Sequence, residues 1–177
     1  MAEKTHLYPI IHKFVNDEFV KLRREKVRIW AFLHSARPFS CDDFFKRPIK
    51  YQGVRFEGLP RKVFWNGFIE PFLNDITFRA IDQALKLCRI EQIDAQPVVQ
   101  ETCGLLKSMA REIYAEMVEV DLMLCNEKNP YGSEKMDVRK HIDTMDRVID
   151  NWAEYELSRN LGSGRGKVLK IKEMREK

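Results

Sequence analysis

The chain has 177 residues, of which 44% are hydrophobic and 11% are aromatic. This composition excludes an intrinsically disordered chain, and the length fits one domain that folds without disulfides or a structural metal. No apolar run approaches the roughly 20 residues that cross a bilayer, and the first residues do not resemble a signal peptide. The four cysteines lie far apart without a C-x-x-C pair, which indicates reduced thiols. We therefore expect a cytoplasmic protein with no membrane partner.

Charge is unevenly distributed along the chain. Residues 1–63 carry 14 basic and 7 acidic side chains, residues 64–164 carry 11 and 18, and residues 165–177 carry 6 and 2. Two basic ends around an acidic middle favour a polyanionic partner. Alternatively, the two signs neutralise each other across the surface of the folded domain.

The chain begins with a helical pattern. Apolar side chains recur every three or four positions over residues 6–35, which predicts one helix with a single buried stripe. The dipeptide Arg37-Pro38 ends this helix, because a residue before proline is disfavoured in the helical conformation. Ser40 is then expected to cap a short helical turn over residues 42–45.

A small β-hairpin is predicted at about residues 48–57, with its turn at Gln52-Gly53. In this register Lys50 and Arg55 stand opposite each other on the exposed face. Like charges in that arrangement destabilise a strand pair unless a negative group lies between them. An anionic ligand and a carboxylate from the acidic middle of the chain fit this requirement equally well.

The following segments are predicted to be helical. A short helix over residues 63–68 leads to Pro71, which suits the first turn of the next helix. Two further helices follow, one opened by Pro97 and one capped by Ser133. The fold class is therefore all-α, a helical bundle of four to five principal helices with one small β-hairpin insertion.

The domain boundary is expected near the end of the last helix. Residues 1–160 would form a single helical domain. Residues 161–177 begin with a glycine-rich joint and continue as a flexible basic tail. Such basic arms commonly attach to nucleic acid, although apolar residues within this tail also allow it to dock on a protein.

No cofactor or catalytic motif is complete. The glycine-rich segment 162–167 lacks the first glycine and the Ser or Thr of a phosphate-binding loop. The histidines and cysteines do not have the spacing of a zinc site. We therefore expect no metal, no cofactor and no catalytic residues, and the main prediction is a protein that is not an enzyme.

Two acidic pairs nevertheless resemble those of all-α nucleoside triphosphate pyrophosphatases. Glu116-x-x-Glu119 and Asp143-x-x-Asp146 share the acid-x-x-acid pattern, and Glu112 adds a carboxylate one turn earlier. The resemblance implies magnesium held against a triphosphate, and carboxylate oxygens suit this ion. At about 100° per residue, however, the two acidic stripes would point apart in a simple helical hairpin. A magnesium-dependent hydrolase is therefore kept as an alternative.

A second enzymatic alternative comes from Arg28 and His34. Their spacing resembles the arginine–histidine pair of HEPN-type ribonucleases, which implies RNA cleavage by a helical bundle. The pair lies in the first predicted helix, whereas the family places it late in the bundle. This is the weaker of the two enzymatic alternatives.

Basic side chains provide the main candidate site. Lys21, Arg24 and Arg28 follow a three-then-four spacing and share one face of the first helix, away from its apolar stripe. Further basic residues are interleaved with aromatic residues around the hairpin, where rings could stack on unpaired bases. The predicted nucleic-acid-binding residues are Lys21, Arg24, Arg28, Arg47, Lys50, Arg55, Arg61, Lys62, Arg165, Lys167, Lys170 and Lys172.

We therefore predict a non-enzymatic helical protein that binds nucleic acid with weak sequence specificity. The alternative is a protein-interaction or assembly module, in which the acidic face of one copy or partner meets the basic face of another. The main prediction requires that the basic side chains form one exposed patch without carboxylate partners of their own.

Overall fold

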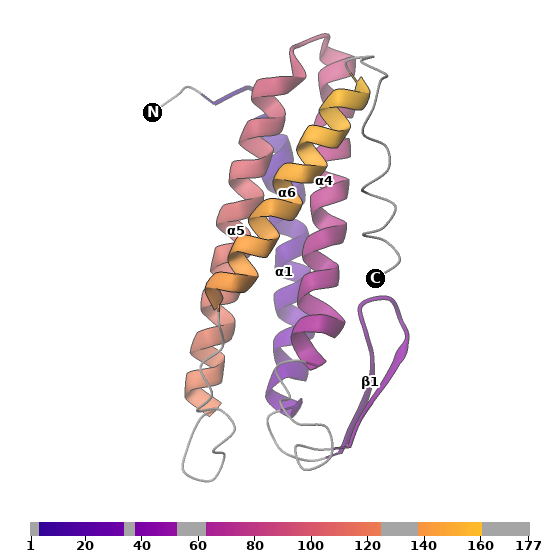
Figure 1. Cartoon of the computed structure of the whole chain (residues 1–177), viewed down its shortest axis with the longest axis vertical. Helices are drawn as coiled ribbons and strands as arrows, with labels where there is room; N and C mark the ends of the chain where they lie inside the picture. Colours follow the sequence, from indigo (N-terminus) through magenta and orange to yellow (C-terminus); the bar gives the residue numbers. More distant parts are fainter. Residues whose placement is uncertain (1–3, 34–37, 53–62, 125–137, 161–177) are drawn as a thin grey trace.

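The computed structural model of the protein describes residues 4–33, 38–52, 63–124 and 138–160. Four long helices run alternately down and up along one bundle (Figure 1). They are α1 (Tyr8–Leu33), α4 (Glu70–Glu91), α5 (Ala95–Leu124) and α6 (Val138–Asn160). The predicted all-α class with one small hairpin is confirmed. The predicted basic tail, residues 161–177, lies outside the described residues.

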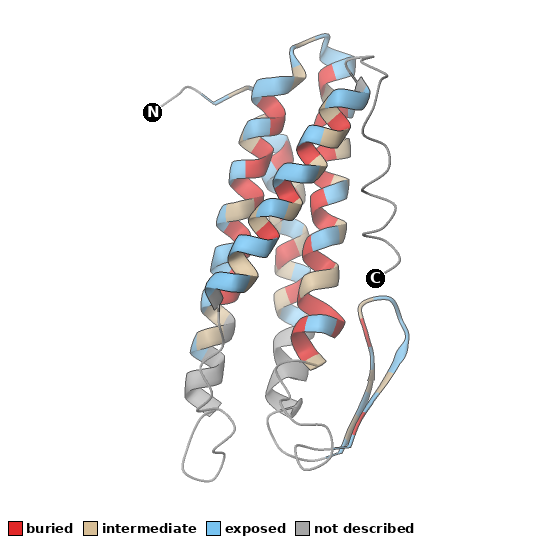
Figure 2. Cartoon of the chain, viewed as in Figure 1, coloured by how far each residue is buried: buried red, intermediate tan, exposed pale blue. Residues whose placement is uncertain are grey.

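The central pair of the bundle is formed by α4 and α5. Each of these two helices contacts α1 and α6, so all four helices contribute to one core. Val15, Ile76, Ile113 and Ile149, one from each helix, are almost completely buried. Figure 2 shows the buried residues along the faces that the helices turn toward one another. The three- and four-residue apolar spacing explains this arrangement, because it gives each helix one apolar stripe.

A π-helical turn, η1 (Trp65–Ile69), leads directly into α4 without a break in the helical backbone. The Glu70 N–H donates to the carbonyl of Trp65, five residues back. Pro71 explains this wide turn. Proline has no N–H to offer to the carbonyl four residues back, which belongs to Gly67, and its ring crowds that carbonyl in a regular helix. The π turn relieves the crowding, and Pro71 lies in the first turn of α4, as predicted.

The hairpin contains one predicted strand, residues 48–51, and one strand that was not predicted, residues 39–42. Strand β1 (Phe39–Asp42) pairs antiparallel with β2 (Pro48–Tyr51), and Ser40 lies opposite Lys50. The expected helical turn over residues 42–45 is therefore wrong, because Ser40 belongs to a strand and residues 43–47 make the connection between the strands. The segment expected to pair with β2, residues 54–57, lies outside the described residues.

The hairpin is docked on η1. The Phe44 N–H donates to the Gly67 carbonyl at 2.9 Å, which is the acceptor that Pro71 cannot serve. The side chain of Ile49 lies so close to Gly67 that a Cβ at this glycine would be only 2.9 Å from Ile49 Cδ1. The Phe44 ring also packs edge-on toward Phe72 of α4, with 6.2 Å between ring centroids. The lower end of α4 thus holds the hairpin beside the bundle (Figure 1).

Two helical glycines provide a test of this packing. Gly104 is exposed in α5, and a Cβ added there would meet no atom within 4 Å. We expect Gly104→Ala to raise the free energy of unfolding by about 1 kcal/mol in urea denaturation, because alanine is a better helix former than glycine. Gly67→Ala should give a smaller gain or a loss, since its new Cβ must displace Ile49. Equal gains for both variants would contradict the docking of the hairpin on η1.

Candidate nucleic-acid interface

The turn of the hairpin is built around the carboxylate of Asp43, which is only 4% exposed. Its Oδ1 accepts a hydrogen bond from the Arg47 backbone N–H at 2.8 Å, and its Oδ2 accepts one from Arg47 Nε at 2.7 Å. The backbone N–H of Asp43 donates to the Arg47 carbonyl, and that of Lys46 donates to the Asp43 carbonyl. Lys46 has a left-handed φ of 62°, which completes the tight turn. These bonds hold the side chains of the turn in one arrangement.

Burial and hydrogen bonding have opposite effects on the pKa of Asp43. Burial of the carboxyl acts to raise it, but the hydrogen bonds and the positive charge of Arg47 outweigh this effect. The pKa therefore lies below its ordinary value, and the carboxylate stays ionised in the folded protein.

Cationic and aromatic side chains project from this turn. Phe45 is 57% exposed, and the guanidinium carbon of Arg47 lies 5.1 Å from the centre of its ring. Lys46 and Lys50 are exposed, and neither has an ion-pair partner among the described residues. Four exposed residues of the hairpin, Phe45, Lys46, Arg47 and Lys50, are called the hairpin tip below; Ser40, Asp42 and Pro48 of the hairpin are exposed as well.

The predicted pairing of Lys50 with Arg55 stays a prediction, because Arg55 lies outside the described residues. On the edge of β2 that pairs with β1, the cross-strand neighbour of Lys50 is Ser40. No like charges oppose each other across this β1–β2 pair, which is joined by the turn at Asp43.

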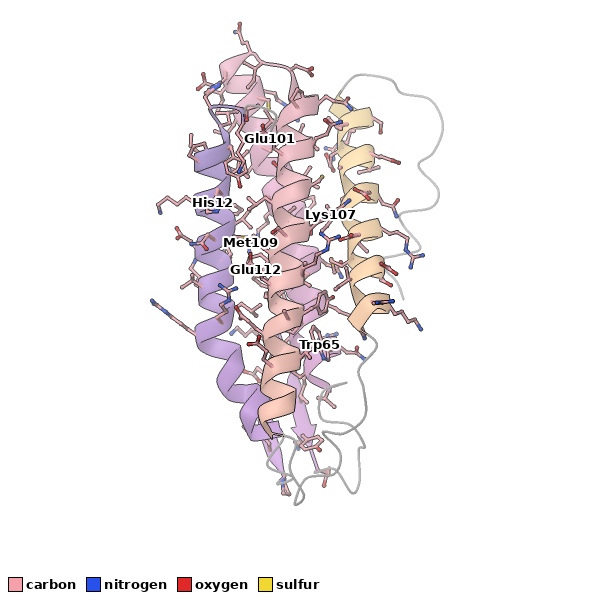
Figure 3. All side chains as sticks on the ribbon, turned by 90° about the vertical axis from the view of Figure 1, so that its left-hand side faces the viewer. His12, Trp65, Glu101, Lys107, Met109 and Glu112 are labelled. Carbon is pink, nitrogen blue, oxygen red and sulfur yellow. The ribbon has the colours of Figure 1, made fainter. Side chains whose placement is uncertain are left out.

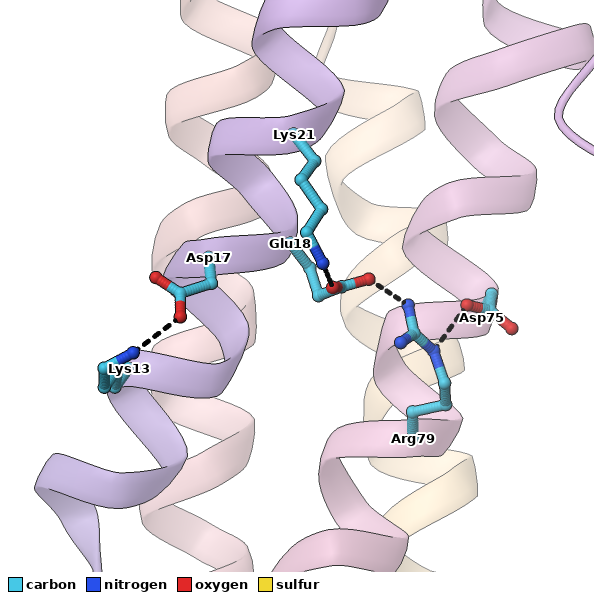
Figure 4. A network of polar contacts seen from close by, with 6 residues as sticks. All are labelled: Lys13, Asp17, Glu18, Lys21, Asp75 and Arg79. Carbon is cyan, nitrogen blue, oxygen red and sulfur yellow. Dashed lines mark hydrogen bonds and ion pairs between the residues drawn. The ribbon is translucent and has the colours of Figure 1, made fainter.

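The predicted basic face of α1 is partly neutralised. Lys21 Nζ lies 2.5 Å from Glu18 Oε1, and the other oxygen of Glu18 binds Arg79 of α4 at 2.6 Å. Arg79 also binds Asp75, so these charges form one network between α1 and α4 (Figure 4). Burial acts to raise the pKa of Glu18, but the hydrogen bonds from Lys21 and Arg79 outweigh it and the net shift is downward. Lys21 therefore does not meet the requirement for an unpaired cation.

Arg24 does meet that requirement. It is exposed on α1, and no carboxylate of the described residues forms an ion pair with it. It belongs to the C-terminal half of α1, which reaches the same end of the bundle as the hairpin (Figure 1). Arg28 also lies in α1, but its side chain is outside the described residues. So are the remaining predicted residues, namely Arg55, Arg61, Lys62, Arg165, Lys167, Lys170 and Lys172.

The acidic pairs face different neighbours. Glu116 of α5 binds Arg23 of α1 at 2.7 Å, and Glu112 lies 3.4 Å from the same guanidinium. Asp146 of α6 instead forms an ion pair with Arg111 of α5. Figure 3 shows Glu112 on the α1 side of α5, opposite the side that carries Lys107 and faces α6.

This separation bears on metal binding. Among the side chains that the structure describes, no group of three or more His, Cys, Asp or Glu residues could hold a metal ion. Glu112 and Glu116 share one arginine, while Asp146 is bound by another on a different side of α5. Glu112, Glu116 and Asp146 thus form ion pairs between helices. The acidic residues of α5 and of α6 point in different directions, as expected from the spacing.

Sequence reasoning missed a polar and aromatic cluster between η1, α5 and α6. The Trp65 ring stacks on Tyr114 and on His141, with centroid distances of 4.7 and 5.7 Å. His141 Nδ1 lies 2.8 Å from Glu70 Oε1 of α4. Each member lies on a different helix or turn, so no spacing within one segment reveals the cluster.

Three buried polar atoms of this region lack a hydrogen-bond partner among the described residues. They are the Tyr114 hydroxyl, Trp65 Nε1 and Asp146 Oδ1. Burial raises the pKa of Tyr114 far above its ordinary value, and the negative charges of Glu70 and Asp146 raise it further. The hydroxyl is therefore neutral at any physiological pH.

Comparisons with known proteins do not assign a function. No family model matches the chain, and neither curated proteins nor solved structures give a match. Within the described ranges, none of the helices has the length and apolar character needed to span a bilayer.

The turn makes a prediction about Asp43. We expect Asp43→Asn to lower the free energy of unfolding by about 1 kcal/mol, because the amide keeps one acceptor oxygen but loses the negative charge and turns an NH2 donor toward a donor of Arg47. Amide hydrogen exchange at Phe44 and Arg47 should accelerate in the variant. Because the folded pKa is depressed, the contribution of Asp43 is complete above the unfolded pKa of about 3.9 and is lost as the pH falls through the folded value. The variant should lack this acid-dependent component, and an unchanged component would rule out Asp43 as its source.

The cluster makes a second prediction. Tyr114→Phe removes a buried hydroxyl that has no partner among the described residues, so we expect no loss of stability and a gain of up to about 1 kcal/mol. Tyr155→Phe, at a half-buried position of α6, serves as the matched control. Thermal and urea unfolding measure both variants. A loss above about 1 kcal/mol in Tyr114→Phe alone would show that the hydroxyl has a bonding partner.

Proposed function

We propose that this protein binds nucleic acid without catalysing a reaction, and that it does so with weak sequence specificity. The binding surface would consist of the hairpin tip and the exposed side of the C-terminal half of α1. The observation that carries the proposal is that Arg24, Lys46 and Lys50 are exposed without a carboxylate partner among the described residues.

Four cations that lie between the helices are used differently. Arg23, Arg79, Lys107 and Arg111 all form ion pairs that join one helix to another. Their positive charge is largely cancelled by the adjacent carboxylates. Arg24, Lys46 and Lys50, which have no carboxylate partner in the described part of the chain, would keep a positive potential that attracts phosphates.

Two further predicted cations can contribute in part. Lys21 is 67% exposed at its side chain, and its pair with Glu18 links two residues on the surface of one helix. Such exposed pairs are worth at most about 1 kcal/mol, so a phosphate can compete for the lysine. Arg47 binds Asp43 through Nε, and its other guanidinium N–H groups have no hydrogen-bond partner within the described ranges.

Weak specificity follows from the types of contact. Lysine and arginine side chains on a helix face and a short hairpin would bind phosphate oxygens, which are the same at every step of a nucleic acid. The sequence adds basic residues outside the described ranges, including those at 55, 61 and 62 and in the tail, and these would extend the same phosphate contacts.

A salt titration tests the proposal. Fluorescence polarisation with labelled oligonucleotides should show binding at low salt that weakens as salt is raised. We expect the double variant Lys46→Ala/Lys50→Ala to flatten the plot of log affinity against log salt by about 0.7 for each phosphate of a single strand that the variant no longer neutralises. Lys13→Ala/Lys86→Ala removes the same charge from lysines that are paired with Asp17 and Asp82, so this matched control should retain the slope.

Other outcomes would contradict the proposal. If no binding occurs at low salt, or if affinity does not change with salt, the exposed cations do not bind phosphates. Light scattering without nucleic acid provides the complementary measurement. A stable, salt-sensitive oligomer in the absence of nucleic acid binding would support the assembly-module alternative instead.

A further inference from the structure

We infer that the hairpin tip stacks an unpaired base on Phe45, so that the preferred ligand is single-stranded nucleic acid. This inference rests on the proposed function and names the form of nucleic acid that the surface would select. Its basis is an exposed aromatic ring held in place among cations.

Two adjacent phenylalanines of the turn have different surroundings. Phe44 is half-buried, and its ring packs toward Phe72 of α4. Phe45 is 57% exposed and touches Phe44 edge-on, with 5.2 Å between ring centroids. Phe44 therefore anchors the turn to the bundle, while most of Phe45 faces water. Among the described residues, contacts with Phe44 and Arg47 cover this ring only in part.

Hydrogen bonds constrain the backbone that carries the Phe45 ring. The Asp43 carboxylate binds both the backbone and the side chain of Arg47, and the Phe44 N–H is bonded to Gly67 of η1. These contacts lie on both sides of Phe45 in the chain. Little conformational freedom of the backbone would be lost when a base stacks on the ring, and this preorganisation favours binding.

The neighbouring charges suit a nucleotide. The Arg47 guanidinium lies over the Phe45 ring, where it can also pack against a stacked base. Lys46 and Lys50 are exposed on the same hairpin and can bind the phosphates that flank that base. A duplex keeps its bases stacked on one another, so Phe45 would add nothing to duplex binding. The aromatic ring therefore distinguishes single strands from duplexes, while the lysines do not.

The experiment separates stacking from charge. The probes are a thymidine oligonucleotide of about 12 nucleotides, an abasic strand of equal length and charge, and the matching duplex. We expect the protein to bind the thymidine strand about 10-fold more tightly than the abasic strand. Phe45→Ala should remove this difference and leave binding of the duplex and the abasic strand unchanged. A uridine strand of the same length shows whether RNA is bound like DNA.

Two variants serve as controls. Phe45→Trp should retain the preference for the thymidine strand, because an indole also stacks on bases. Ile90→Ala truncates an apolar side chain that is 73% exposed near the end of α4, at the other end of the bundle, and should behave as the unaltered protein. Far-UV circular dichroism confirms that each variant is folded.

The outcomes distinguish the two proposals. Salt-dependent binding that is equal for thymidine and abasic strands, or that Phe45→Ala does not change, would overturn base stacking and leave the proposed function intact. Failure of every probe to bind at low salt would overturn both. Loss of the strand preference in Phe45→Ala, with its retention in Phe45→Trp, would establish Phe45 as the stacking residue.

Discussion

The missing N–H of Pro71 is the constraint on which the attachment of the hairpin to the bundle depends. A proline inside a continuous helix leaves one carbonyl without a donor, and here that carbonyl belongs to Gly67. The helix widens into η1, and the Phe44 N–H of the hairpin takes the open acceptor. The absence of a side chain at Gly67 lets Ile49 pack against it. One local defect of a helix thereby determines where a cationic hairpin is attached.

The distribution of charge in the sequence is only partly preserved as surface charge. Arg23, in the basic first third, is bound by two glutamates of the acidic middle, and Lys107 is bound by Asp150. In these pairs the basic and acidic side chains of the folded domain neutralise each other. This was the alternative to a polyanionic partner. The hairpin differs because its one buried carboxylate, Asp43, is used to shape the turn, and its lysines have no carboxylate partner among the described residues.

Periodicity was sufficient to predict the helices, because burying an apolar stripe every three or four residues depends on local sequence. Strand β1 and the turn at Asp43 were not predicted, for a physical reason. Ser40 and Asp43 resemble a helix cap, and the same residue types also favour turns, so only the contact of Asp43 with Arg47 distinguishes the two. The ion pair of Lys21 could have been predicted from the sequence, since Glu18 lies three residues earlier on the same helix. The pairing of His141 with Glu70 required the packed bundle.

The position of Trp65 gives the molecule a built-in optical probe. This indole belongs to the same π turn as Gly67, which accepts the hydrogen bond from the hairpin, and its ring lies against His141 of α6. Any displacement of the hairpin that disturbs η1 must also change the surroundings of the indole. The contribution of Trp65 to the intrinsic fluorescence would then respond to events at the hairpin, where residues 39–51 contain no tryptophan.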